Sequence, residues 1–85
     1  MENETKSIRS ISTIAYEIVK RWPKPYFGAV PYIDAMKQLN LITDTYIAES
    51  GRSIVSYFLS NASSWKGEDA KRIKAELKQL MNGAR

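Results

Sequence analysis

The stretch Ile54-Val-Ser-Tyr-Phe-Leu-Ser-Asn-Ala62 decides the fold that we predict for this chain. Its apolar residues recur at helical spacing, and Tyr57 extends the apolar arc well beyond one narrow stripe. A short helix that is apolar over so much of its circumference needs partners on more than one side. We therefore expect a central helix over residues 54–62, with Phe58 fully buried.

The segments around this helix each carry a single apolar stripe, so each can cover one of its flanks. We predict an all-α fold, a compact single-domain bundle of four helices, over about residues 6–22, 31–39, 49–62 and 65–82. Residues 1–4 are expected to form a frayed leader before a single helical domain over residues 5–85.

The first helix is expected to begin at a cap formed by Thr5 or Ser7, because either hydroxyl can accept from a first-turn amide. Glu17 and Arg21 stand four residues apart in the favourable order for an ion pair. Pro23 biases the residue before it away from the helical region, which ends the helix. Its apolar face comprises Ile8, Ile11, Ile14, Ala15, Ile18, Val19 and Trp22.

The connection over residues 22–31 contains three prolines, Gly28 and the three large rings of Trp22, Tyr26 and Phe27. One interpretation is a rigid corner whose rings close the end of a small core. The other is an aromatic surface for a peptide, a nucleobase or a partner protein. Because small domains need their large aromatics for the core, we favour the corner, with Trp22 and Phe27 structural and Tyr26 partly exposed.

Pro31 fits the first turn of the second helix, whose stripe comprises Tyr32, Ala35, Met36 and Leu39, with Ile33 at its margin. The pattern over residues 41–48 allows two interpretations. Either one long helix begins at Asp44, or a loop is followed by a helix from Glu49 or Ser50. We choose the loop, because Thr43-Asp44-Thr45 is poor helix interior and Gly51 is costly in mid-helix.

The last helix is expected to be capped by Ser63 or Ser64, and it carries a continuous apolar stripe: Ala70, Ile73, Leu77, Leu80, Met81 and Ala84. Four cations fall along one edge of that stripe, within ~60° on a helical wheel: Lys71, Lys74, Lys78 and Arg85. Such a line is either a solvated face or a contact surface for DNA or RNA. A helix-turn-helix over residues 54–77 is a further alternative, although its connection is longer than the usual tight turn.

Composition excludes several classes of site. The 85 residues include no cysteine and no histidine, so disulfides, thiolate metal sites and the commonest general base are absent. We expect no cofactor, no metal site and no enzymatic activity, since no constellation of side chains meets the requirements of an active site. No signal peptide or membrane-spanning run is present, which predicts a cytoplasmic protein without a membrane partner.

The strings WPKPYFGAVPYIDAM (residues 22–36) and SIVSYFLSNASSWKGEDAKRIKAEL (residues 53–77) resemble small, uncharacterised helical proteins encoded on bacterial phages and integrated mobile elements. The resemblance covers most of the chain, from Ile8 to Leu80. In such relatives we expect a glycine near position 47 and an aspartate near position 49, where this chain has Ile47 and Glu49. The resemblance implies a bacterial or phage origin and a cytoplasmic setting, but no site residues.

Two functions follow as expectations. The first is a protein-interaction module that binds a partner protein, or a second copy of itself, through Trp22, Tyr26 and Phe27. The alternative is a weak nucleic-acid-binding protein. It would use the basic edge of the last helix, Lys71, Lys74, Lys78 and Arg85, with support from Lys20, Arg21 and Lys24. The net charge of +4 is modest for a dedicated DNA-binding protein, which favours the first.

Overall fold

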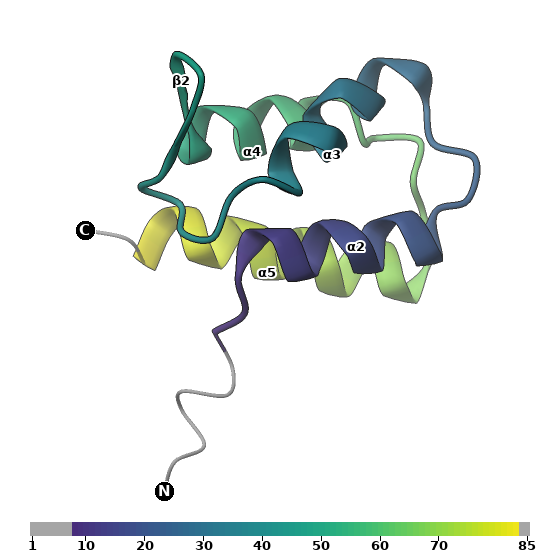
Figure 1. Ribbon diagram of the computed structural model, residues 1–85. Helices are drawn as coiled ribbons and strands as arrows, with labels where there is room; N and C mark the ends of the chain where they lie inside the picture. The colour runs from purple at the N-terminus through teal and green to yellow at the C-terminus, as the bar shows by residue number, and fades with distance from the viewer. Residues whose placement is uncertain (1–7, 84–85) are drawn as a thin grey trace, which may run out of the picture.

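Four α-helices form the framework of the computed structural model, which describes residues 8–83 (Figure 1). They are α2 (Ile11–Arg21), α3 (Val30–Met36), α4 (Gly51–Ser60) and α5 (Glu68–Gly83). The short 3-10 helix η1 (Phe27–Ala29) leads into α3, and Pro31 lies in the first turn of α3 as predicted. Two-residue strands, β1 (Thr45–Tyr46) and β2 (Glu49–Ser50), precede α4. The predicted all-α bundle of four helices in one domain is confirmed.

The helices form an antiparallel ring, in which each packs against two neighbours (Figure 1). The beginning of α2 lies beside the segment that follows α3, where the amide of Ser12 donates to the carbonyl of Leu39. Arg52, in the first turn of α4, donates to the carbonyl of Met81 near the end of α5. Helix α5 returns beside α2 and closes the ring. Helix α4 is therefore one side of the ring, and the predicted central position of residues 54–62 is replaced by a core shared among four helices.

The core contains the apolar face of every helix. Phe58 is fully buried as predicted, and the ring of Trp22 meets it edge-on at 6.4 Å between centroids. Tyr57 is 46% exposed and lies beside Tyr32, so its predicted place in the apolar arc is wrong. The other large, fully buried side chains are Ile11, Ile14, Ile18, Met36, Leu39, Val55, Ile73 and Leu77. Ile8 and Val19 are exposed, whereas Ile33, predicted at the margin, is buried.

Helix α2 begins later than predicted, at Ile11. Ser10 is its cap, because the Ser10 hydroxyl accepts from the amide of Thr13 at 3.1 Å. The first amide of the helix is held by a distant partner, the carbonyl of Asn40. The predicted caps Thr5 and Ser7, and the predicted leader over residues 1–4, lie outside the described residues.

Helix α5 also begins later than predicted, at Glu68, directly after Gly67. Gly67 has a φ of +107°, a conformation that glycine adopts readily and other residues rarely. Ser63 and Ser64 lie in a turn before it and do not cap the helix, which corrects the prediction. Ala84 and Arg85 lie outside the described residues.

The loop interpretation of residues 41–48 is confirmed, and the loop contains a hairpin that the sequence did not predict. Strands β1 and β2 pair antiparallel, with Ile47 at φ +58° in the tip. This left-handed conformation favours glycine over a β-branched residue, and it falls where the resemblance expects glycine. Helix α4 then begins at Gly51, where a Cβ would lie 2.9 Å from the carbonyl oxygen of Ile42. Only glycine fits this close approach without a shift of the loop.

None of the helices within residues 8–83 is long and apolar enough to cross a membrane.

Candidate nucleic-acid interface

Four lysines surround one surface cavity of about 410 Å³ along α5 and the connection before it. Lys71, Lys74 and Lys78 come from the helix itself, and Lys66 comes from the connection that precedes it. We call these four residues the lysine edge. Trp65, Gly67, Ala70 and Ala75 complete the lining of the cavity.

The lysine edge is positioned by a pair of stacked tryptophans. Trp65 is buried, and its ring stacks on Trp22 at 5.3 Å between centroids with an angle of 7° between the planes. This contact holds the segment before α5 against the corner that follows α2. The Nζ atom of Lys74 then donates to the carbonyl of Trp65 at 2.7 Å, which ties the helix edge to the segment that carries Lys66. Two parts of the chain thereby present their lysines to one cavity.

The charges of the lysine edge are not compensated by carboxylates. Within residues 8–83, none of its four lysines forms an ion pair. The pKa of Lys74 is lowered, first by burial of the ammonium group and then by the positive charges of Lys66 and Lys78. An anion in the cavity would favour the protonated form of Lys74, so the cavity is suited to a phosphate or carboxylate ligand.

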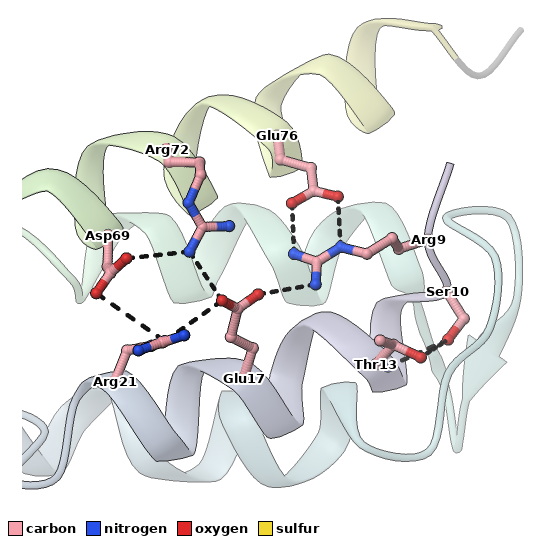
Figure 2. A network of polar contacts seen from close by, with 8 residues as sticks. All are labelled: Arg9, Ser10, Thr13, Glu17, Arg21, Asp69, Arg72 and Glu76. Carbon is pink, nitrogen blue, oxygen red and sulfur yellow. Dashed lines mark hydrogen bonds and ion pairs between the residues drawn. The ribbon is translucent and has the colours of Figure 1, made fainter. Parts of the chain in front are cut away.

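The opposite side of α5 is also charged, but its charges are paired across the contact with α2 (Figure 2). The guanidinium of Arg9 donates two hydrogen bonds to Glu76, at 2.6 and 2.9 Å. Glu17 accepts from Arg9 and from Arg72, each at 2.8 Å. These residues form, together with Arg21 and Asp69, what we call the ionic edge: three arginines and three carboxylates.

Glu17 is the centre of the ionic edge (Figure 2). The hydrogen bonds from Arg72 and then Arg9 lower the pKa of Glu17 from its ordinary value of 4.5 to about 2. The predicted pair Glu17–Arg21 is present at 3.5 Å. Because Arg21 is engaged there and also lies 4.0 Å from Asp69, it does not support the lysine edge as predicted. Lys20 and Lys24 are exposed.

The three aromatic candidates have separate environments. Trp22 is only 9% exposed and belongs to the core, which removes it as a partner-binding residue. Tyr26 is 47% exposed, as predicted. Phe27 was predicted to be structural and is 79% exposed, so that prediction is wrong. Phe27 is the first residue of η1, which is a single turn. The residue of this turn that faces the core is Ala29, which is fully buried. The rings of Tyr26 and Phe27 lie 4.9 Å apart between centroids, and we call them the exposed ring pair.

The sequence identified Lys71, Lys74 and Lys78 as one edge, and the structure brings them to one cavity. Arg85, the fourth predicted residue, lies outside the described residues. Lys66 was missed, because it is not in the helix and its approach depends on the stacked tryptophans. A helix-turn-helix is not formed, since α4 and α5 run antiparallel through their contact (Figure 1), not at the steep angle of that motif.

A larger groove of about 690 Å³ lies at the other end of α5, where its apolar lining includes Ile8, Leu41 and Leu80. Its charged residues, Arg9 and Glu76, are already paired with each other. Among residues 8–83, no group of three or more acidic side chains is placed to hold a metal ion. The lysine edge is therefore the site with the clearest ligand chemistry.

Comparison with known proteins found no matching family model, no matching curated protein and no matching solved structure. The resemblance to phage and mobile-element proteins accordingly stays a prediction from the two sequence strings.

Proposed function

We propose that this protein binds the phosphate backbone of nucleic acids through the lysine edge. One observation carries the proposal: four lysines surround a single cavity and form no ion pair within residues 8–83. Each phosphate contacted by a lysine releases condensed counterions, which is the main source of affinity in backbone binding.

The chemistry of the site indicates weak binding with little dependence on sequence. Lysine ammonium groups act as point charges and contact phosphates, whereas bases are read mainly by bidentate or apolar contacts. The lysine edge contains no arginine, asparagine or glutamine. We expect dissociation constants near the usual non-specific range, roughly 10⁻⁴ to 10⁻⁶ M at physiological salt.

The experiment measures the salt dependence of binding by fluorescence anisotropy with a labelled oligonucleotide. Lys71→Gln/Lys78→Gln removes two charges of the lysine edge and keeps Lys74, whose hydrogen bond to Trp65 has a structural role. Each lost phosphate contact should make the slope of log affinity against log salt shallower by about 0.9 on duplex DNA, so the double variant should change it by about 2.

The matched control is Lys37→Gln, compared with the single variant Lys78→Gln; each removes one positive charge, but Lys37 lies outside α5. Lys37 is already paired with Asp34 at 3.4 Å. The control should change the slope by less than about 0.5, whereas Lys78→Gln should change it by about 0.9. Undetectable binding at low salt, or equal slope changes in Lys37→Gln and Lys78→Gln, would contradict the proposal.

A second candidate function is the binding of a partner protein or of a second copy of this chain. It is supported by the exposed ring pair, since two adjacent aromatic rings, Tyr26 and Phe27, are 47% and 79% exposed. Sedimentation velocity over a range of protein concentrations tests self-association. A dimer that the variant Phe27→Ser abolishes would support self-association through these rings. A monomer at every concentration would contradict it.

The cytoplasmic setting and the phage-type origin belong to the same proposal. They rest on the two resembling strings.

A further inference from the structure

We infer that the nucleic acid bound at the lysine edge is single-stranded, with bases that stack on Phe27 and Tyr26. This inference rests on the proposed function and names its substrate class. The juxtaposition behind it is that the exposed ring pair and the beginning of the lysine edge lie at the same end of the bundle.

Two contacts establish that juxtaposition. The connection before α5, which carries Lys66, is stacked on the aromatic corner through Trp65 and Trp22. The same connection begins at Asn61, and a Cβ built on Gly28 would lie 2.8 Å from the Oδ1 atom of Asn61. Figure 1 shows the segments after α2 and after α4 at one end of the molecule. A strand that leaves the cavity at Lys66 toward Asn61 therefore reaches the aromatic corner.

The exposed ring pair is held in place for stacking. A Cβ on Gly28 would lie 2.5 Å from the Cε2 atom of Tyr26, so the tyrosine ring rests directly on the glycine backbone. The planes of Tyr26 and Phe27 are inclined by 55°, so the two rings do not stack face to face on each other. Phe27 keeps 79% of its surface in solvent, which leaves its ring open to a flat, apolar partner.

Rings beside lysines are the usual composition of surfaces that bind single strands, where bases stack on aromatics and cations follow the backbone. Lys24, an exposed residue two positions before Tyr26 in the chain, adds a further positive charge to the same corner. In a duplex the faces of the bases are already stacked on one another and are closed to protein rings. The exposed ring pair can therefore add affinity for a single strand only, whereas the lysine edge serves both forms.

The experiment compares a labelled single-stranded oligothymidine with a duplex of equal length, by fluorescence anisotropy at low salt. The wild type should bind the single strand more tightly. Phe27→Ala should weaken single-strand binding roughly tenfold, the usual contribution of one stacked base, and leave duplex affinity unchanged. It should also leave the salt slope unchanged, because it removes no charge.

The control variant is Tyr16→Ala, which removes a ring of α2 that is 59% exposed and should alter neither affinity. Because Phe27 makes few contacts, Phe27→Ala should stay folded, which circular dichroism checks before binding is measured. Tyr26→Ala provides a second test, with a smaller loss on the single strand, since this ring is about half buried.

The outcomes separate this inference from the proposed function. Unchanged single-strand binding in folded Phe27→Ala, while Lys71→Gln/Lys78→Gln still flattens the salt slope, overturns the stacking and keeps the lysine edge. Equal losses on single strand and duplex overturn it too. A dimer that depends on Phe27 would show that the rings bind a second copy of the chain, which also overturns the inference that bases stack on them. Absence of binding to either form ends both proposals.

Discussion

Helix α5 presents two charged edges that differ in how their charges are compensated. On the ionic edge, three arginines and three carboxylates from α2, α5 and the preceding Arg9 form a connected set of ion pairs. On the lysine edge, four cations surround a cavity, and no carboxylate within residues 8–83 pairs with them. Both edges are visible in the sequence only as charged residues at helical spacing.

The difference indicates what each edge contributes. A connected set of partly buried ion pairs holds α2 and α5 in register, so the ionic edge contributes to stability. On the lysine edge, repulsion between the cations disfavours the folded state, and the hydrogen bond of Lys74 to the carbonyl of Trp65 is the structural contact. In the function that we propose, the arrangement of these lysines serves to bind an anion instead. The proposed binding edge and the stabilising edge thus lie on opposite sides of one helix.

The largest effect should come from the core on which both edges depend. Phe58→Ala should lower the free energy of unfolding by about 3–5 kcal/mol, because it removes a fully buried ring that contacts Trp22. Urea denaturation measures the loss, with Tyr57→Ala, which truncates a half-exposed ring, as control. Stability close to that of the wild type would show that α4 does not share the core with α2 and α5.

A smaller loss is expected at the centre of the ionic edge. Glu17→Gln should lower the free energy of unfolding by about 1.5–3 kcal/mol, because Arg9 and Arg72 both lose a charged acceptor. Glu49→Gln, at an exposed carboxylate of β2, is the matched control and should change stability by less than about 0.5 kcal/mol. Equal effects of the two variants would show that the ion pairs of the ionic edge contribute no more to stability than an exposed carboxylate does.

The same carboxylate predicts an acid dependence. The pKa of Glu17 is lowered from 4.5 to about 2, so its stabilisation is present above about pH 4.5 and is lost as the pH falls toward 2. Over this window the difference in stability between the wild type and Glu17→Gln should shrink steadily. Denaturation at a series of pH values measures it, and a constant difference would contradict the assignment of the ion pairs.

The smallest effect is expected on the lysine edge, with the opposite sign. Lys78→Gln should raise the free energy of unfolding by about 0.2–0.5 kcal/mol at low salt, because it relieves repulsion with Lys74 one turn away. The gain should vanish in about 1 M salt, where such charges are screened. A decrease in the free energy of unfolding of more than about 1 kcal/mol would show that this lysine has a structural role. The lysine edge would then contribute to stability as the ionic edge does.

Local patterns predicted most of the fold. The apolar periodicity of residues 54–62 identified α4 and its buried ring, and the poor helix formers around Asp44 identified the loop before it. The turn chemistry was less visible. In the turn before the hairpin, the carboxylate of Asp44 accepts from the amides of Leu41 and Asn40, which lower its pKa. A single aspartate among threonines gives no clear sign of that contact.

The candidate sites were predicted in part, for a physical reason. Helical spacing places Lys71, Lys74 and Lys78 on one edge without further information. The addition of Lys66 requires the stacking of Trp65 on Trp22, and the pairing of Arg9 with Glu76 joins residues 67 positions apart. Such contacts depend on the closed ring of helices. The exposure of Phe27 depends likewise on which residue of one short turn faces inward.

The stacked indoles have a consequence for how this molecule can be observed. Trp22 and Trp65 are its two tryptophans, and they lie in van der Waals contact with nearly parallel planes. All tryptophan emission therefore originates at one end of the bundle, beside the cavity. Separation of the indoles should change the emission as soon as that end opens, whereas far-ultraviolet circular dichroism follows all four helices. Coincident transitions in the two signals would indicate all-or-none unfolding. An earlier change in emission would identify this end as the first part of the molecule to open, without any added label.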